Sequence, residues 1–358
     1  MGLADKLKEL EEELARTQKN KATEFHIGIL KSKIAKIKKE LAGPKKSAKK
    51  SSGFSIKKSG DATVALVGLP STGKSTLLNA LTGAKSKTAH YSFTTLNCIP
   101  GILNYKGAKI QILDLPGIIA GAKDGVGRGK EVISAAKSAD LILLVLDVFD
   151  PFYREKLVSE LYASSIRLDS SPPKISLEKK KSGGVSINSL VKEQGISNET
   201  IVGILKEYGI FNANLILHEK IFTDDLIDFL DGSRVYIPSL TVINKIDLDN
   251  SVLKKLEYDF IAVSAQTGEG LTELKEKIFQ KLNLIRVYTK SKFNEIDNVP
   301  LMIKKGQTIA DVCKKLHKEL YINFKYALVW GKSVKYPAQK VGLNHVLEDE
   351  DIIQIIKK

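Results

Sequence analysis

A glycine-rich segment near residue 70 has the residue types and the spacing of a phosphate-binding loop. An apolar run at residues 63–67 leads into the pattern G-x-x-x-x-G-K-S, and the residues after it are typical of a helix. Glycines allow a tight loop whose backbone N–H groups point at phosphates, and the helix N-terminus adds a favourable dipole. We expect Lys74 to reach the β- and γ-phosphates and the Ser75 hydroxyl to bind Mg²⁺. The predicted phosphate site comprises Gly68, Pro70, Ser71, Thr72, Gly73, Lys74, Ser75 and Thr76.

A second pattern, N-K-x-D at residues 244–247, predicts that the bound base is guanine. Guanine presents its N1–H and its N2 amine side by side, and one carboxylate, that of Asp247, can accept both hydrogen bonds. We expect Asn244 to bridge the base and the neighbouring loops, and the stem of Lys245 to cover a face of the base. A segment that resembles the S-A-K loop, whose backbone N–H contacts guanine O6, is formed by Ser264, Ala265 and Gln266.

Two segments between these motifs carry residues that can respond to a γ-phosphate. An apolar run at residues 110–113 leads into D-x-x-G, in which Asp114 would hold Mg²⁺ through water and the Gly117 N–H would contact the γ-phosphate. In the run Tyr-Ser-Phe-Thr-Thr-Leu we choose Thr95 over Thr94 as the hydroxyl that closes over Mg²⁺ and the γ-phosphate. The predicted catalytic residues are Lys74, Thr95 and Gly117, and the predicted metal ligands are Ser75, Thr95 and Asp114.

These motifs, taken together, resemble those of a known family. Residues 114–129 and the run Tyr-Ser-Phe-Thr-Thr-Leu are similar to the switch regions of Obg-like GTPases. Residues 324–331 and 345–351 resemble the developmentally regulated GTP-binding proteins of archaea and eukaryotes, and the match runs over nearly the whole chain. The resemblance implies a cytosolic GTPase that binds GTP or GDP with Mg²⁺ and associates with ribosomes and translation. It also implies that a TGS domain, a small β-grasp module, follows the GTPase core.

The implied reaction is attack of water on the γ-phosphate, which depends mainly on positioning and electrostatic stabilisation. Many small GTPases place a water-orienting glutamine just after D-x-x-G, whereas this chain has Ile118 and Ile119, so we expect slow intrinsic turnover. Some relatives use a monovalent cation held by an asparagine at the position of Ser71, which leaves potassium dependence open. Two alternatives also stay open. One is a binding or assembly module that uses GTP as a structural ligand, and the other is an Obg-like ATPase, which Asp247 disfavours.

The composition excludes several other classes of protein. The chain has 358 residues with 43% hydrophobic content, which is enough for two or three packed domains. No apolar run is long enough to span a membrane and no secretory signal is visible, so we expect a cytoplasmic protein without membrane contact. The two cysteines support neither a disulfide framework nor a cysteine-based zinc site.

Much of the net charge of +15 lies in the first 60 residues, which hold 15 lysines and one arginine against seven acids, a net of +9. On sequence alone, this run fits a solvated tail and an RNA-binding arm equally well. An RNA-binding arm would gain affinity because neutralised phosphates release counterions. The family resemblance favours RNA, so the ribosome or ribosomal RNA is the predicted partner. The sequence identifies no regulatory protein partner.

Spacing along the chain predicts an α/β protein built from four parts. Leucine and isoleucine stripes at residues 3–14 and 30–41 predict two paired helices. The 91 residues that separate Asp147 from Ser239 far exceed one βαβ crossover and indicate an insertion. The predicted parts are a basic helical hairpin with its linker (1–60), a P-loop GTPase core (61–164 and 236–283), a small inserted α+β domain (165–235) and a C-terminal TGS β-grasp domain (284–358).

Local patterns predict the elements of the inserted segment. We expect a β-hairpin around Gly183 and Gly184, because this pair lies between two short strand-like runs. Helices are expected near residues 198–208 and 224–230, the second with Thr223 as its N-cap.

The C-terminal segment has the order strand, strand, helix, strand, strand, which suits a β-grasp fold. Its helix is expected to begin at Thr308, where Asp311 gives the spacing of a capping box. We expect Tyr326 and Trp330 to be core residues of this domain rather than a binding platform.

Overall fold

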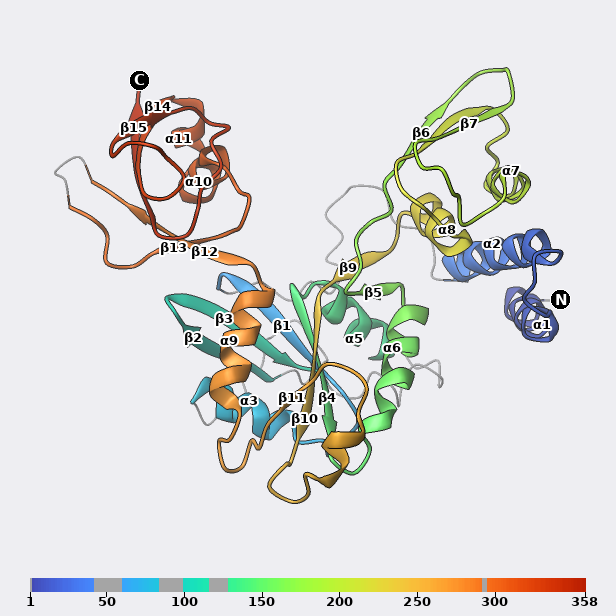
Figure 1. The fold of residues 1–358 in the computed structure, drawn as a ribbon, viewed down its shortest axis with the longest axis horizontal. Helices are drawn as coiled ribbons and strands as arrows, with labels where there is room; N and C mark the ends of the chain where they lie inside the picture. Colours follow the sequence, from blue (N-terminus) through green and yellow to red (C-terminus); the bar gives the residue numbers. More distant parts are fainter. Residues whose placement is uncertain (1, 42–59, 84–98, 116–127, 292–294) are drawn as a thin grey trace. The chain divides into compact units, whose positions relative to one another are not determined.

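The structure, a computed structural model, describes residues 2–41, 60–83, 99–115, 128–291 and 295–358 (Figure 1). The chain folds into two compact units. One unit contains the two N-terminal helices together with Ser165–Tyr236, and the other contains the P-loop core and the C-terminal domain. Among the described residues, no helix has the length and apolar character needed to cross a membrane.

The P-loop core is built on a six-stranded sheet with the order β11-β10-β4-β1-β3-β2. Five strands are parallel, and β2 pairs antiparallel with β3. The strands are β1 (Ala62–Val67), β2 (Ile99–Tyr105), β3 (Ala108–Asp114), β4 (Leu141–Asp147), β10 (Ser239–Asn244) and β11 (Ile261–Ala262). β4 is buried from Leu141 to Leu146. Its continuous apolar run is what a strand between two helical layers requires.

Helices cover both faces of this sheet (Figure 1). They are α3 (Lys74–Thr82) and α9 (Leu271–Lys281) on one face, and α5 (Arg128–Lys137) and α6 (Arg154–Ala163) on the other, with 3-10 turns at Pro151–Tyr153 and Ser251–Lys255. Leu77 of α3 and Ile278 of α9 join the sheet in one apolar core, and Leu157 of α6 is buried. The carboxyl ends of the parallel strands therefore share one edge, where ligands bind in sheets of this type.

The C-terminal domain is a five-stranded sheet with the order β13-β12-β16-β14-β15. Its strands are β12 (Leu284–Thr289), β13 (Leu301–Lys304), β14 (Phe324–Trp330), β15 (Gln339–Val341) and β16 (Asp351–Lys357), and its helices are α10 (Ile309–Leu316) and α11 (Lys318–Ile322). The capping box of α10 is present, since Asp311 Oδ2 accepts the Thr308 N–H at 2.9 Å. The predicted order of elements is confirmed, with the short helix α11 and the strand β15 in addition.

The expectation that Tyr326 and Trp330 are core residues is wrong. Side chains alternate along β14: Ala327 and Val329 are fully buried in the core that includes α10, whereas Tyr326 and Trp330 are half-buried. Successive strand residues face opposite sides of a sheet, so both aromatic rings lie on the face opposite α10. Aromatic character alone did not distinguish the two faces.

The inserted segment contains a three-stranded sheet with β8 (Ala213–Leu217) in the centre, between β6 (Ile175–Lys179) and β7 (Val185–Ser189). The predicted β-hairpin around Gly183 and Gly184 is wrong, because both strands pair with β8 and not with each other. β8 buries every second side chain completely and so takes the central position, whereas the more polar β6 and β7 become edges. A separate two-stranded sheet pairs β5 (Ile166–Leu168) with β9 (Val235–Ile237).

The predicted N-terminal hairpin is present as α1 (Leu3–Arg16) and α2 (Glu24–Leu41), and the inserted helices are α7 (Asn198–Glu207) and α8 (Thr223–Asp231). Phe222, not Thr223, is the N-cap of α8. α2 packs directly on α7, because a Cβ at Gly28 would approach Thr200 Cγ2 to 2.7 Å. Ala35 of α2 belongs to the core of the inserted segment. The hairpin and the insertion, which the sequence assigned to separate parts, lie in one compact unit.

Four of the five lysines in α2 contact oxygen atoms of the same unit. The four contacts are Lys31 with Asp224 at 2.8 Å, Lys36 with the Glu207 carbonyl at 2.5 Å, Lys38 with Glu11 at 2.8 Å, and Lys39 with Asp231 at 3.1 Å. Three of these contacts join α2 to the inserted segment. Much of the positive charge of this helix is therefore used inside the protein.

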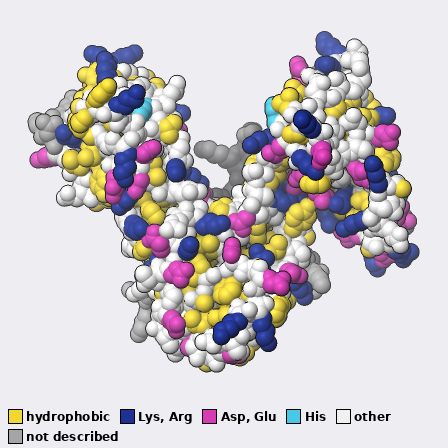
Figure 2. Space-filling model, in the orientation of Figure 1, with side chains coloured by type: hydrophobic (Ala, Val, Ile, Leu, Met, Phe, Trp, Pro, Cys, Tyr) yellow, Lys and Arg dark blue, Asp and Glu magenta, His cyan; other side chains and the backbone are white. Residues whose placement is uncertain are grey.

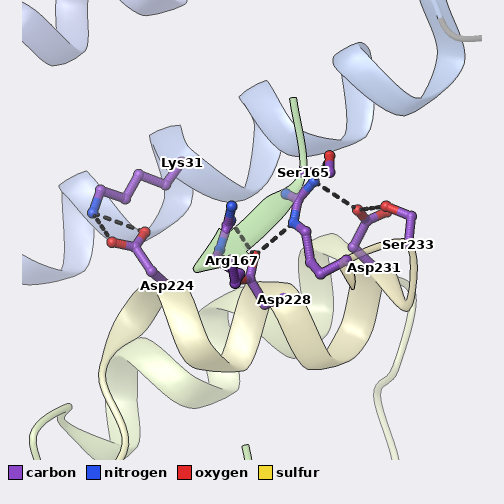
Figure 3. Close-up of polar contacts among 8 residues, drawn as sticks. Lys31, Ser165, Arg167, Asp224, Asp228, Asp231 and Ser233 are labelled. Carbon is purple, nitrogen blue, oxygen red and sulfur yellow. Dashed lines mark hydrogen bonds and ion pairs between the residues drawn. The ribbon is translucent and has the colours of Figure 1, made fainter. Parts of the chain in front are cut away.

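A buried ion-pair cluster lies beside these contacts (Figure 3). Asp228 accepts hydrogen bonds from Arg167 Nε at 2.6 Å and from Arg234 Nε at 2.7 Å. Arg234 also pairs with Asp231 at 3.3 Å, and Asp231 accepts a hydrogen bond from Ser233. Burial alone would raise the pKa of Asp231, but hydrogen bonds from Ser233 and Lys39 and the charge of Arg234 hold it below its usual value of 3.8. The cluster connects β5, α8 and α2 electrostatically.

Candidate nucleotide site

The predicted phosphate loop connects β1 to α3 at the carboxyl edge of the parallel sheet. Two glycines allow the loop to approach its neighbours. A Cβ at Gly68 would lie 2.1 Å from the carbonyl oxygen of Val145 in β4, and a Cβ at Gly73 would lie 2.5 Å from Asn244 Nδ2. Gly73 also has a φ of +83°, which side chains disfavour. The loop is therefore packed against β4 and β10 in a way that larger residues would prevent.

The ammonium of Lys74 lies inside this loop and donates hydrogen bonds to two carbonyl oxygens, those of Gly68 at 3.1 Å and Leu69 at 2.7 Å. The residue is only 8% exposed. Burial lowers the pKa of Lys74, and the nearby charge of Asp114 opposes that shift. A cation held at a helix N-terminus next to backbone N–H groups is suited to bind phosphate oxygens.

Two of the predicted metal ligands meet at the same place. Ser75 Oγ donates to Asp114 Oδ2 at 2.5 Å, and β3 brings Asp114 beside Leu66 of β1. A hydroxyl and a carboxylate are hard oxygen ligands of the kind that Mg²⁺ prefers, so the donor set fits this ion. Within the described part of the chain, no cluster of three or more His, Cys, Asp or Glu side chains could hold another metal. Thr95 and Gly117 lie outside the described residues, and their roles stay predictions.

Asn244 connects the phosphate loop to the loop after β11. Its amide nitrogen donates to the Thr72 carbonyl at 2.9 Å, and its amide oxygen accepts the Ala265 N–H at 3.0 Å. Ser264 is fully buried, and its Oγ accepts the Thr267 N–H at 3.1 Å. A single buried amide thus brings the phosphate loop, N-K-x-D and the S-A-K-like segment together.

Sequence reasoning assigned no role to Asp147, which lies at the end of β4 opposite Asn244 in the sheet. Asp147 Oδ2 pairs with Lys245 Nζ at 2.9 Å, and Oδ1 accepts the N–H groups of Phe149 and Asp150 at 3.2 Å. Lys245 has a φ of 68°, so its backbone is in the left-handed region. Asp147 therefore fixes the charged end of the lysine whose stem is expected to cover the base. The signal was available: a carboxylate closing the strand next to β10.

The predicted site residues differ in exposure. The buried ones with polar side chains are Thr72, Lys74, Asp114, Asn244 and Ser264. The exposed ones, which are accessible to a ligand, are Pro70, Ser71, Ser75, Thr76, Asp247 and Gln266. The arrangement can bind polyphosphate and a purine base side by side at one sheet edge.

Three segments of the chain match known protein families. Residues 63–179 match the family described as 50S ribosome-binding GTPase. Residues 182–284 match the C-terminal region of the MMR_HSR1 domain, and residues 285–357 match the TGS domain. These matches cover both the P-loop core and the β-grasp domain.

Full-length relatives are similar to the whole chain. An uncharacterized GTP-binding protein of Methanocaldococcus jannaschii is 51% identical, with 100% of this chain and 94% of the relative covered. Developmentally-regulated GTP-binding protein 1 of Xenopus laevis is 47% identical, with 100% of both chains covered. The crystal structure of a GTP binding protein from Pyrococcus horikoshii OT3 is 17% identical and covers 83% of this chain and 100% of its own, with a TM-score of 0.42. Because that score is low, membership of a family rests on the sequence identities.

Proposed function

The chain belongs to the family of developmentally regulated GTP-binding proteins, and from that premise we propose that it hydrolyses GTP to GDP and phosphate, with Mg²⁺, as a ribosome-associated switch in the cytoplasm. One observation carries the proposal of hydrolysis. Lys74, Ser75 and Asp114 meet at the loop between β1 and α3, and Asn244, the first residue of N-K-x-D, donates a hydrogen bond to the same loop.

The residues of this chain would act mainly by position and charge. Lys74 would exchange its two carbonyl partners for phosphate oxygens and stabilise negative charge on the transferred group. Ser75 and Asp114 would hold Mg²⁺, which when bound neutralises charge on the β- and γ-phosphates. Thr95 and Gly117 are proposed to contact the γ-phosphate. The chain has isoleucines where a water-orienting glutamine is common, so slow intrinsic turnover is part of the proposal.

Guanine selection is assigned to Asp247, whose carboxylate is exposed at the end of the N-K-x-D loop. The ion pair between Asp147 and Lys245 supports this assignment, because it fixes the loop from which Asp247 projects. Ribosome association is supported by the description of the family that residues 63–179 match. The lysine-rich N-terminal region supplies positive charge, which favours a polyphosphate partner.

Phosphate release from GTP by the purified full-length protein tests the proposal. We expect release in Mg²⁺ that stops with EDTA, rises when ribosomes are added, and is absent in Lys74→Ala. Parallel reactions in Na⁺ and in K⁺ decide potassium dependence. Binding of GTP without release in any condition would instead indicate a module that uses GTP as a structural ligand. Displacement of labelled GTP by an equal concentration of ATP would indicate an ATPase.

A further inference from the structure

The outer face of the β-grasp sheet, defined as the face opposite α10, combines aromatic and aliphatic side chains. On β14 this face carries Tyr326, Leu328 and Trp330, all half-buried. The neighbouring strands place beside them, in register, Ile352, Gln354 and Ile356 of β16, Tyr288 of β12 and Lys340 of β15. Three aromatic rings therefore lie on one partly exposed surface.

Two lysines lie over the rings of this outer face. Lys290 Nζ is 4.3 Å from the ring centroid of Trp330, and Lys340 Nζ is 4.3 Å from the ring centroid of Tyr326. These distances are well within the range of about 6 Å over which a cation is attracted to an aromatic face. Each ring therefore has a positive charge fixed beside it.

Two acidic residues near the outer face, Asp349 and Glu350, are neutralised by Arg286 of β12, which lies on the same face as Tyr288. Asp349 and Glu350 both pair with Arg286, at 2.6 Å and 2.9 Å, and Asp351 is fully buried. Among the described residues, none of the positions on the outer face is acidic. By contrast, basic and acidic side chains are interspersed over most of the surface seen in Figure 2. The outer face is thus locally positive as well as aromatic.

We infer that the outer face binds single-stranded RNA, with bases stacked on Tyr326 and Trp330 and phosphates contacted by Lys290 and Lys340. Proteins that bind single strands combine stacking rings with cations in this way, and the stacking does not depend on the base. Tyr326 and Trp330 are four residues apart on one strand, about 13 Å, so they serve different nucleotides. A protein partner fits less well, because lysine is depleted from the centres of protein interfaces.

This inference rests in part on the proposed ribosome association, since RNA is the partner that a ribosome offers. It is nevertheless separate from the N-terminal lysines and from the nucleotide site. Trp330 is the only tryptophan of the chain, so its fluorescence reports on the outer face of the unmodified protein.

The test is a fluorescence titration of the full-length protein with an RNA oligonucleotide of about ten nucleotides, within the range bound by small single-strand-binding domains. We expect saturable loss of Trp330 emission. Tyr326→Leu should weaken binding about tenfold, the loss expected for one stacked base. Lys290→Gln with Lys340→Gln should lower the slope of log affinity against log salt by about 1.4, about 0.7 for each phosphate contact. Lys325→Gln, on β14 but not on the outer face, is the matched control and should bind as the parent does.

Labelled RNA that binds while Trp330 emission stays constant would overturn the inference, and so would equal salt slopes in the parent and the double lysine variant. A change in emission with intact ribosomes but not with extracted ribosomal RNA would assign the outer face to a protein partner and also overturn it. Cosedimentation with ribosomes separates the two proposals. If the parent and all variants cosediment equally, the inference fails and the ribosomal function stands; if the parent does not cosediment, the ribosomal function fails.

Discussion

The nucleotide site and the unit that contains α1, α2 and Ser165–Tyr236, called the helical unit below, use lysine in opposite ways. Lys74 is held by carbonyl groups five and six residues away, in a loop that a phosphate can enter. Lys31, Lys36 and Lys39 contact residues 171 to 193 positions away and join two segments of one unit. We propose that the lysine charge binds a ligand in the first region, whereas in the second region it joins segments of the fold. Substitutions should therefore change ligand affinity in one region and stability in the other.

In the nucleotide site, the largest expected effect is that of Lys74→Ala on GTP affinity. The variant loses charged hydrogen bonds to two phosphates, so GTP should bind about a hundredfold more weakly. The free energy of unfolding without nucleotide should change little, because the two hydrogen bonds to loop carbonyls are offset by the cost of burying the ammonium. Titration with a fluorescent GTP analogue and urea unfolding measure the two quantities. A large loss of stability with unchanged affinity would reverse the comparison for this lysine.

In the helical unit, Asp228→Ala should have the largest effect on stability. It removes the buried carboxylate that both Arg167 and Arg234 contact, and removal of one partner from a buried ion-pair cluster costs about 3–5 kcal/mol. GTP affinity should stay as in the parent. Because Trp330 lies in the other unit, hydrogen exchange of the α2 and α8 amides is the suitable measurement. Asp224→Ala, which removes a half-exposed partner of Lys31, is the matched control and should cost less than about 1 kcal/mol.

Asp147→Asn tests whether a lysine of the nucleotide site can depend on a distant partner, as those of α2 do. The ion pair with Lys245 is lost while the shape is kept, so GTP and GDP should both bind about tenfold more weakly, a change of about 1.4 kcal/mol. Base preference should not change, whereas Asp247→Asn should shift preference from GTP to xanthosine triphosphate. In a Lys245→Met background, Asp147→Asn should have no further effect. A full additional loss in that background would show that Asp147 acts through another group.

The motifs of the candidate nucleotide site could be located from the sequence because their residues are close together along the chain and have fixed spacing. Gly68 to Ser75 and Asn244 to Asp247 are short motifs at the ends of apolar strands, and the structure places both at one edge. Asp147 was missed because its partner is 98 residues away and the one local sign, a carboxylate at the end of an apolar strand, does not identify that partner.

The sequence described the helical unit less well because its contacts also join residues that are far apart along the chain. The helices of the hairpin follow from their apolar periodicity, but nothing local shows that Gly28 permits close packing on Thr200. The pairing of β6 and β7 with β8 depends on which strand is most apolar, so the pattern around Gly183 suggested the wrong neighbours. On β14, periodicity identified the strand but not which face would be covered by α10.

Acid should weaken the helical unit through Asp231, whose pKa lies below the usual value of 3.8 in the folded protein. A carboxylate with a lowered pKa contributes stability at pH values above 3.8, and this contribution is lost as the pH falls through the folded-state pKa. Asp231→Asn should therefore show a smaller loss of stability between pH 5 and pH 2 than the parent (a range of roughly one to two units on either side of that value). Hydrogen exchange of α8 across this range measures it. Identical profiles would mean that other carboxylates determine acid sensitivity.

The smallest expected effect is a difference in stability between variants of two lysines of α2, one that is paired inside the protein and one that is exposed. Lys31 pairs with Asp224, whereas Lys33 is exposed and has neither an ion pair nor a hydrogen bond among the described residues. Lys31→Gln should cost about 0.2–1 kcal/mol of stability, and Lys33→Gln should cost almost none. If the arm binds RNA, Lys33→Gln should weaken that binding more than Lys31→Gln does.

These point variants are better suited to testing the arm than deletion of residues 1–60. The deletion would remove α2, including Ala35 and the buried face that packs on α7, and would confuse lost charge with lost structure. Urea unfolding and RNA titration of the two variants, at matched salt, complete the test. Equal losses of RNA binding would mean that the ion pair of Lys31 opens at little cost. The lysines of α2 would then remain available to RNA. They would differ from Lys74 in the residues that they contact, but not in their availability to a ligand.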